Sequence, residues 1–416
     1  MKYCSRCLYS SIHRLNLTFD SSNVCSGCRV HEEKDQLDWS SRQKKLGSIL
    51  EAYRNRSGNN YDCVVPVSGS RDSFFIVHTI KNVFGLNPLL VTYNKQYNTD
   101  VGVRNLANLR IRFDCDIMTM TVNPERVKKI TRATMRRFGS IYWHCLAGQT
   151  VYPVQVAVKF KIPLIIWGVH QGIDQVGMFS HLNEVEMTRK YRKEHDLMGY
   201  EAEDLIDAFD NINEQDVVQY RYPDDKELEQ VGVRGIYLSN YIRWDSRTQH
   251  EQMIRAYGYE TFKQHRTFDA YNDVDCWNYS DTHDYIKVVK YGYGKVTDHA
   301  CREIRFGRMT REQGINLVQR YAREQCRNLP QFMSWLGITE SAFHHIIDQH
   351  RNPEVWRRNK EWEWEAIEDN IEMLIQSGNP KEALEQIEPF RDFELTPEGQ
   401  SADSKEEYIL IGKGVK

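Results

Sequence analysis

Short apolar segments that alternate with helical patterns constrain the fold of this chain more than any other feature. Four near-continuous apolar runs are "YDCVVPV" (61–67), "NPLLVTYN" (87–94), "CDIMTMTV" (115–122) and "IPLIIWG" (162–168), and "RGIYLSNY" (234–241) is a candidate fifth. Runs of this kind are typical of strands that are buried on both faces, and the segments between them have helical patterns. The sequence therefore predicts an α/β fold with a parallel, doubly wound sheet.

The charge balance and the apolar runs exclude two classes of partner. The chain has 416 residues, 55 of them basic and 58 acidic, with a formal net charge of -3. This balance does not favour nucleic acid as a bulk electrostatic partner. No apolar run approaches the roughly 20 residues that a membrane helix needs, and the N-terminus lacks the apolar segment of a signal peptide. We expect no nucleic-acid partner, no membrane partner and a cytoplasmic location.

Four of the ten cysteines stand in two pairs near the N-terminus, as Cys4-x-x-Cys7 and Cys25-x-x-Cys28. Two such pairs are typical of one tetrahedral zinc site. A redox site would need one pair at the start of a helix that follows a strand, and neither condition holds here. The sequence predicts a structural Zn²⁺ held by the four thiolates.

The composition changes along the chain and suggests four parts. We expect a zinc knuckle at 1–35, an α/β domain at 36–240, a helical domain for substrate or partner at 241–360 and an acidic helical tail at 361–416. Beyond residue 241 the strand patterns stop, and aromatic and charged residues interleave at helical spacing.

The turn "SGSRDS" after the first strand carries the chemistry. Ligands of open parallel sheets bind beyond the carboxyl ends of the strands, and the start of a helix favours an anion. Ser68 and Ser73 can donate to phosphate oxygens, Gly69 permits a close backbone approach, and Arg71 adds positive charge. Asp72 suits a phosphate site only with a cation, which predicts Mg²⁺ between carboxylate and phosphates. The turn is neither a Walker A loop nor a dinucleotide fingerprint.

The turn resembles the SGGxDS PP-loop of the N-type ATP pyrophosphatases, which bind the β,γ-pyrophosphate of ATP. Ser70 replaces the second glycine, and Arg71 stands where lysine is common. The resemblance implies that Ser68 to Ser73 bind ATP in a PP-loop ATP-binding domain, with catalytic roles for Ser68, Asp72 and Ser73. The alternative is a serine-rich turn that only caps a helix.

A wider resemblance runs from Met1 to about residue 350. The cysteine pairs, "IPLIIWG", "RGIYLSNYIRWD" and "YGYGKVTDHACREIRFGRMTREQG" together resemble the N-acetyl sugar amidotransferases of bacterial surface-polysaccharide (lipopolysaccharide O-antigen) synthesis. These enzymes convert an acetamido group on a nucleotide-linked sugar into an acetamidino group.

The resemblance implies that ATP adenylates the acetamido oxygen with release of pyrophosphate, and that ammonia then replaces AMP. It also implies Mg²⁺ as a cofactor, together with glutaminase and cyclase-like subunits that deliver ammonia. The chain itself shows no glutaminase signature, because none of its cysteines lies in a glycine-rich nucleophile turn; Cys145 comes nearest.

Further candidates lie at the ends of the predicted strands. Tyr93 and Asn94 end the second strand, where nucleotide bases commonly lie, and Gly168 ends the fourth. Tyr93 is equally well explained as an aromatic side chain that covers the core.

Polar residues next to these strands are weaker candidates. His170 and Asp174 follow the fourth strand and face either the site or solvent. His144 and Gln149 lie near a helix start, and His144 is a candidate substrate contact, although a lone histidine is more often structural.

A charged helical face completes the predicted site. Lys295, Asp298, Arg302 and Arg305 are spaced by 3, 4 and 3 residues, which places them on one side of a helix. They form either a solvated ion-pair stripe or a charged wall that binds the sugar diphosphate or a uronate.

Two other functions remain open from the sequence. A tRNA sulfur-transferase can also combine cysteine pairs with a PP-loop, but it would need a basic surface and a catalytic cysteine near the loop. A non-catalytic nucleotide-binding module could retain a degenerate loop, but Ser68, Asp72 and Ser73 are all present.

Overall fold

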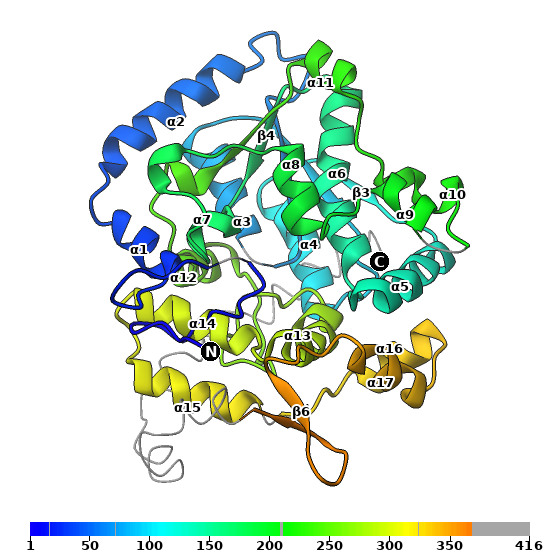
Figure 1. The fold of residues 1–416 in the computed structure, drawn as a ribbon. Coiled ribbons are helices and arrows are strands. Elements are labelled where there is room, and N and C mark those ends of the chain that lie inside the picture. The colour runs from blue at the N-terminus through cyan, green and yellow to red at the C-terminus, as the bar shows by residue number, and fades with distance from the viewer. Residues whose placement is uncertain (16, 71, 209–210, 323, 368–416) are drawn as a thin grey trace.

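The computed structural model describes residues 1–367, apart from residues 16, 71, 209–210 and 323, and has a five-stranded parallel sheet at its centre (Figure 1). The strand order is β3-β2-β1-β4-β5. The strands are β1 (Cys63–Pro66), β2 (Pro88–Tyr93), β3 (Ile117–Met120), β4 (Leu164–Trp167) and β5 (Arg234–Tyr237). All neighbouring strands pair in parallel. The predicted α/β class with a doubly wound parallel sheet is confirmed.

Helices cover both faces of the sheet because successive side chains of a strand point to opposite sides. Val65 of β1 packs in a cluster with α2 (Trp39–Tyr53), α3 (Ser73–Val77), α4 (Asp100–Arg112) and α12 (Ser246–Tyr257). Its neighbour Val64 packs on the other face, against α6 (Trp143–Phe160). The carboxyl ends of β1 and β4 lie between these two layers.

The remaining helices of the α/β part are short apart from α5. They are α1 (Ser26–Glu33), α5 (Pro124–Phe138), α7 (Gln171–Asp174), α8 (Arg189–Tyr191), α9 (Ala202–Ala208), α10 (Glu214–Val217) and α11 (Asp225–Val231). Five short helices of this part, π or 3₁₀ in type, are η1 (His78–Val83), η2 (His181–Asn183), η3 (Arg192–Asp196), η4 (Val218–Tyr220) and η5 (Leu238–Asn240). A sixth, η6 (Asn278–Thr282), lies in the region after residue 241. Since η1 directly continues α3, the helical segment after the "SGSRDS" turn extends from residue 73 to residue 83.

The region after residue 241 is mainly helical, as predicted, but it also contains a hairpin. Its helices after α12 are α13 (His283–Tyr291), α14 (Lys295–Arg305), α15 (Arg311–Ala322), α16 (Leu329–Leu336) and α17 (Glu340–Asp348). β6 (Trp356–Arg358) pairs antiparallel with β7 (Trp364–Ala366).

The hairpin shows that helix was the wrong prediction at the start of the acidic tail. "EWEWEA" alternates with the two-residue period of a strand. The Arg351 guanidinium lies over the rings of Trp356 and Trp364, 4.9 and 5.0 Å from their centroids, and so packs against both strands. Residues 368–416 of the predicted tail lie outside the described residues.

The cysteine-bearing N-terminal segment has no core of its own. Its cysteines, Leu8 and Tyr9 share one apolar cluster with side chains of α14 and α15, such as Ala300 and Leu317. Residues 259–275 contain no helix or strand, yet 266–276 are buried throughout. We call residues 259–276 the buried segment. Within the described part of the chain, no helix is both long and apolar enough to cross a membrane.

Candidate active site and metal centre

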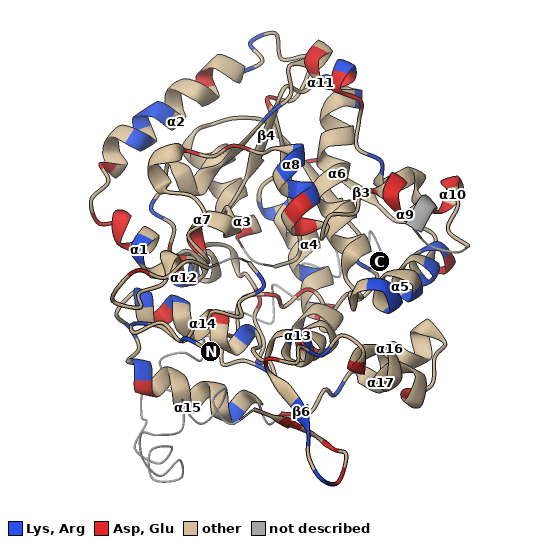
Figure 2. Cartoon of the chain, viewed as in Figure 1, with Lys and Arg blue, Asp and Glu red and all other residues tan. Residues whose placement is uncertain are grey.

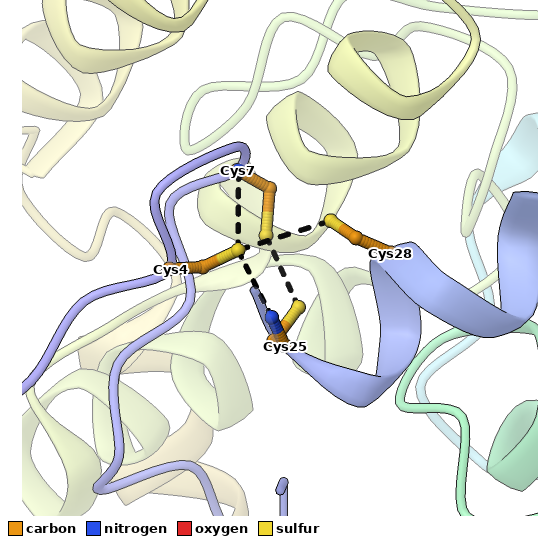
Figure 3. A group of neighbouring side chains, drawn as sticks. All are labelled: Cys4, Cys7, Cys25 and Cys28. Carbon is orange, nitrogen blue, oxygen red and sulfur yellow. Dashed lines mark hydrogen bonds between the residues drawn. The ribbon is translucent and has the colours of Figure 1, made fainter. Parts of the chain in front are cut away.

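The four paired cysteines meet in a buried cluster (Figure 3). Cys4 Sγ lies 3.9 Å from Cys28 Sγ, Cys7 Sγ lies 3.6 Å from Cys25 Sγ, and all four sulfur atoms lie within 4.8 Å of one another. Tetrahedral Zn–S bonds of about 2.3 Å would place the sulfur atoms roughly 3.8 Å apart. The four residues therefore fit Zn²⁺ and leave no ligand position open.

The surroundings of the cluster favour thiolates. The backbone N–H groups of Arg6, Cys7 and Cys25 point at Cys4 Sγ at 3.3–3.5 Å. Hydrogen bonds within the cluster lower the pKa of Cys4 and Cys25 and raise the pKa of Cys7 and Cys28, so the thiols share their protons unequally. An Arg305 guanidinium nitrogen lies 3.8 Å from Cys25 Sγ. Donors and a cation around sulfur compensate the negative charge that four thiolates retain on Zn²⁺.

The "SGSRDS" turn lies at the carboxyl end of β1 and is held by its own hydroxyl groups. The Ser73 hydroxyl accepts from the Ser68 N–H at 3.0 Å and donates to the Ser70 carbonyl at 2.9 Å. The Ser68 hydroxyl donates to the same carbonyl at 3.2 Å. The two hydroxyls that the sequence assigned to phosphate thus shape the turn, and either would have to reorient to contact a nucleotide. Arg71 lies outside the described residues.

Glycine is required in this turn by protein packing. A Cβ at Gly69 would clash with the backbone of Gly102 in the first turn of α4, and a Cβ at Gly102 would clash with Asp275 in the buried segment. The Asn105 side chain donates to the Gly69 carbonyl at 3.0 Å. The sequence expectation was a close approach to phosphate, whereas the observed close approach is between three backbone segments.

Ser70, which replaces a glycine of the PP-loop pattern, has a structural contact of its own. Its side chain is fully buried, and its hydroxyl accepts from the Val274 N–H at 3.0 Å. The side chain therefore points at the buried segment and away from any phosphate. Only the backbone of Ser70 remains available to a nucleotide.

Three cavities meet at the turn. The central cavity, of about 270 Å³, is lined by Ser68, Asp72 and Ser73 and lies between β1 and β4. The β2–β3 cavity, of about 250 Å³, is lined by Ser68 and Gly69. The α14 cavity, of about 140 Å³, is lined by Asp72 and by α14. Asp72 is 8 % exposed and lines both the central and the α14 cavity, so this residue stands where their contents would meet.

The candidate residues at the ends of the strands line the same cavities. Gly168 lines the central cavity, Asn94 lines the β2–β3 cavity, and Tyr93 lines both. The Tyr93 hydroxyl is also bonded to His144 Nδ1 at 3.0 Å and to the Tyr220 hydroxyl at 2.8 Å. Tyr93 thus covers the core and also faces two cavities, so its place is compatible with both roles that the sequence left open.

The structure does not bring every polar candidate to the cavities. His144 is buried between Tyr93 and Tyr97, does not line any of the three cavities, and has its pKa lowered to about 3 by burial. His170 is likewise enclosed by aromatic rings. Gln149 lines the central cavity and Asp174 the α14 cavity, where Asp174 forms an ion pair with the buried Lys34.

The predicted charged face of α14 lines one cavity together with Asp72. Its charges are neither solvated nor free. Arg302 donates to Asp269 at 2.8 Å, and Lys295 Nζ lies 3.4 Å from Asp273 Oδ2. Asp298 accepts from the Tyr9 hydroxyl at 2.8 Å and pairs with Lys287, which lowers its pKa against the effect of burial. The stripe is therefore a buried ion-pair network that forms one wall of the α14 cavity.

Several cavity residues had no signal in the sequence, because the segments that carry them have no recognisable motif. From the described residues, the central cavity also contains Arg14, Lys95, Gln171, Tyr191, Asp196, Asp273 and Tyr279. Lys95 and Asp275 form a buried ion pair of 2.7 Å next to the turn. Figure 2 shows acidic and basic residues interleaved over the elements around this region, in keeping with the balanced net charge.

Comparisons with known proteins cover parts of the chain. A match of 25 % identity over 117 residues connects it to an uncharacterized protein of Methanocaldococcus jannaschii, and covers 28 % of this chain and 42 % of that protein. Among solved structures, the NH3-dependent NAD synthetase from Campylobacter jejuni, in complex with nitrate, aligns with a TM-score of 0.28 and 11 % identity, over 47 % of this chain and 95 % of the other.

A family match covers the region that carries the buried segment and α14. Residues 238–369 match the family described as LPS biosynthesis protein WbpG-like, C-terminal domain. This match agrees with the resemblance to the amidotransferases of surface-polysaccharide synthesis that the sequence motifs predicted. The matched region, residues 238–369, is thus similar to the C-terminal domain of the WbpG-like lipopolysaccharide biosynthesis proteins.

Proposed function

We propose that the chain is an ATP-dependent amidotransferase that acts on a nucleotide-linked N-acetyl sugar. It would adenylate the acetamido oxygen, release pyrophosphate, and replace AMP with ammonia to leave an acetamidino sugar. The observation that carries the proposal is the position of Asp72, which lines both the central cavity at the turn and the α14 cavity of the WbpG-like region. Nucleotide and sugar can therefore meet at this residue.

The central cavity suits ATP. Ser68 and Ser73 lie at its turn, and Gly168 and Tyr93 lie at the ends of the neighbouring strands, where ligands of parallel sheets bind. Asp72 would hold Mg²⁺, which supplies charge neutralisation for the departing pyrophosphate. Arg14 reaches the same cavity, and its guanidinium donates to the His195 carbonyl at 3.3 Å. A guanidinium in this position would stabilise the negative charge on the α-phosphate oxygens during adenylation.

The α14 cavity suits the sugar. Its wall combines Lys295, Arg302 and the ring of Tyr279, over which Lys295 Nζ lies at 4.5 Å from the centroid. Because buried carboxylates hold both cations in place, the wall is rigid before the substrate arrives. Preorganised donors lose little freedom on binding, so this wall would orient the acetamido group towards Asp72.

A sulfur-transfer reaction fits the site less well. That chemistry needs a reactive thiol near the activated carbon. All ten cysteines are described, and none of them lines the three cavities at the turn. Burial raises the pKa of both Cys63 and Cys145. A buried neutral thiol is a poor nucleophile.

Mass spectrometry of candidate UDP-N-acetyl sugars tests the proposal. The purified chain is incubated with ATP, Mg²⁺ and ammonium, and both the nucleotide and the sugar products are measured. We expect AMP and pyrophosphate to form only with the correct sugar, whose mass changes by the difference between O and NH. Formation of ADP, or AMP without a change in the sugar, would contradict the proposal.

A further inference from the structure

Three acidic side chains from the described residues line the central cavity, and the proposed function gives no role to one of them. They are Asp72, Asp196 and Asp273. Asp72 lies at the turn, and Asp273 lies 3.4 Å from Lys295. Among the residues that the structure describes, Asp196 makes no hydrogen bond through its carboxylate, and no cation lies within ion-pair distance of it.

The surroundings of Asp196 combine tyrosine side chains with two guanidinium groups that lie beyond ion-pair distance. Asp196 ends η3, and the Tyr191 ring lies 4.7 Å from the ring of His195. The titratable and charged groups around its carboxylate come from the N-terminal segment, from α8 and η3, and from β5: Arg14, Tyr191, Arg192, His195 and Tyr237. Burial raises the pKa of Asp196 to about 6, against the opposing effect of Arg14 and Arg192. A carboxylate with this pKa can accept and return a proton near neutral pH.

We propose that Asp196 is a catalytic residue that carries the proton of the acetamido nitrogen during amidation. This inference rests on the proposed function. In the first step, the acetamido oxygen attacks the α-phosphorus of ATP, the bond from phosphorus to the bridging oxygen breaks, and pyrophosphate leaves. The N–H proton moves to Asp196 as the C=N bond of the imidate forms.

The second step returns the proton. The nitrogen of ammonia attacks the imidate carbon, and Asp196 gives its proton back to the sugar nitrogen. One proton of the former ammonia passes to pyrophosphate or water. The C–O bond then breaks with its electron pair on AMP, and a protonated amidine remains. Atoms and charges balance with ATP, ammonia and the sugar as the reactants.

The location of Asp196 explains why this carboxylate and not Asp72 would carry the proton. A Mg²⁺-bound carboxylate is a weak base, because the cation holds its lone pairs. Asp196 lines the same cavity from a different element, and its burial raises its pKa, which makes it the stronger base.

The test uses the full chain and a sugar with heavy oxygen in its acetamido carbonyl. The wild type should transfer the label to AMP, which reports adenylation of that oxygen independently of Asp196. Asp196→Asn should slow AMP formation by about 10²–10⁴-fold, the usual range for loss of an acid–base group. The KM values for ATP and sugar should stay near those of the wild type. Glu194→Gln, an exposed neighbour in the same turn, should retain normal rates.

The pH dependence of kcat/KM gives a second test, because a residue with only a structural role would not change it. An ionised carboxylate is the competent base, so wild-type kcat/KM should fall as the pH drops through about 6. Asp196→Asn should lose this acidic limb, and Asp196→Glu should retain it at reduced rate. Circular dichroism and the melting temperature confirm that the variants are folded.

Each outcome separates the inference from the proposed function. Label in AMP together with a near-normal rate for Asp196→Asn would overturn the inference alone. A variant with a raised sugar KM and an unchanged kcat would also overturn it, because Asp196 would then only bind. If the wild type puts no label into AMP, the proposed function fails and the inference fails with it.

Discussion

At the scale of single residues, most polar groups at the site have two tasks. Ser73 shapes the turn through Ser68 and Ser70, and it also faces the central cavity. Tyr93 anchors a buried hydrogen-bond network and lines two cavities. Substitutions at such positions change structure and chemistry together. A substitution of Asp72 should affect the chemistry more than the structure, because the expected role of Asp72 is to place a cation.

Asp72→Ala should lose turnover with little loss of folding. Removal of a group that stabilises developing charge typically costs about 10²–10³ in rate. We expect this loss in AMP formation at saturating ATP and Mg²⁺, while Arg71→Lys, which keeps the cation, retains activity. Ser68→Ala and Ser73→Ala should weaken ATP binding. Near-normal conversion of ATP to AMP by Asp72→Ala would show that the turn has been assigned wrongly.

At the scale of elements, the site depends on contacts between segments that are distant in sequence. The turn after β1 touches the first turn of α4 at Gly102 and the buried segment at Val274, and Gly102 itself lies against Asp275. The N-terminal cysteine segment packs on α14 and α15. Arg305 of α14 links the cysteine segment to the end of α7, because it reaches both Cys25 and the Gln175 carbonyl, 2.7 Å away.

Ser70→Ala should destabilise the protein by about 1–3 kcal/mol, because the buried Val274 N–H would lose its acceptor. Urea unfolding would measure this as a lower midpoint with an unchanged slope. Ser48→Ala, on the exposed side of α2, is the matched control and should stay within about 0.5 kcal/mol of wild type. Equal stability of the two variants would argue against the observed contact.

The cysteine cluster should hold one Zn²⁺ per chain, detectable by elemental analysis of protein purified without a chelator. Cys7→Ser should lower the melting temperature, because the metal stabilises a segment that shares its core with α14 and α15. ATP binding, measured calorimetrically at a temperature where the variant is folded, should not be selectively lost. A preparation without zinc that melts like the wild type would contradict this prediction.

At the scale of the whole molecule, the α/β layer provides the turn and the WbpG-like region provides the opposite wall, and the reaction is proposed for the space between them. Ammonia must reach this space. Cys145, the nearest approach to a glutaminase nucleophile in the sequence, is completely buried, and burial raises its pKa. We therefore propose that a separate glutaminase, with a cyclase-like subunit, supplies the ammonia.

The purified chain should use ammonium chloride and should not use glutamine alone. Glutamine should become a donor only after a glutaminase partner is added. AMP formation with each nitrogen donor at equal concentration measures this. Turnover with glutamine in the absence of a partner would overturn the proposal, and Cys145→Ala would then show whether the activity lies within this chain.

The sequence by itself determined the local features. Apolar runs around Val64, Leu90 and Ile165 predicted three of the buried strands, and the spacing of the four cysteines predicted their cluster. The face of α14 was also predicted, since residues three and four apart on a helix necessarily share a side. Each of these inferences uses a period or a spacing within one short segment, which local geometry preserves after folding.

Only the tertiary structure decided what these features contact. The "SGSRDS" motif did not indicate that Ser70 would bind Val274, and no period in "YRKEHDLMG" marked Asp196 as a cavity residue. The charges of α14 could not be classified as solvated or buried until Asp269 and Asp273 were placed beside them. Such contacts join residues that are separated by tens to hundreds of positions, and their free energy depends on the burial and charge that both partners acquire only when the chain is packed.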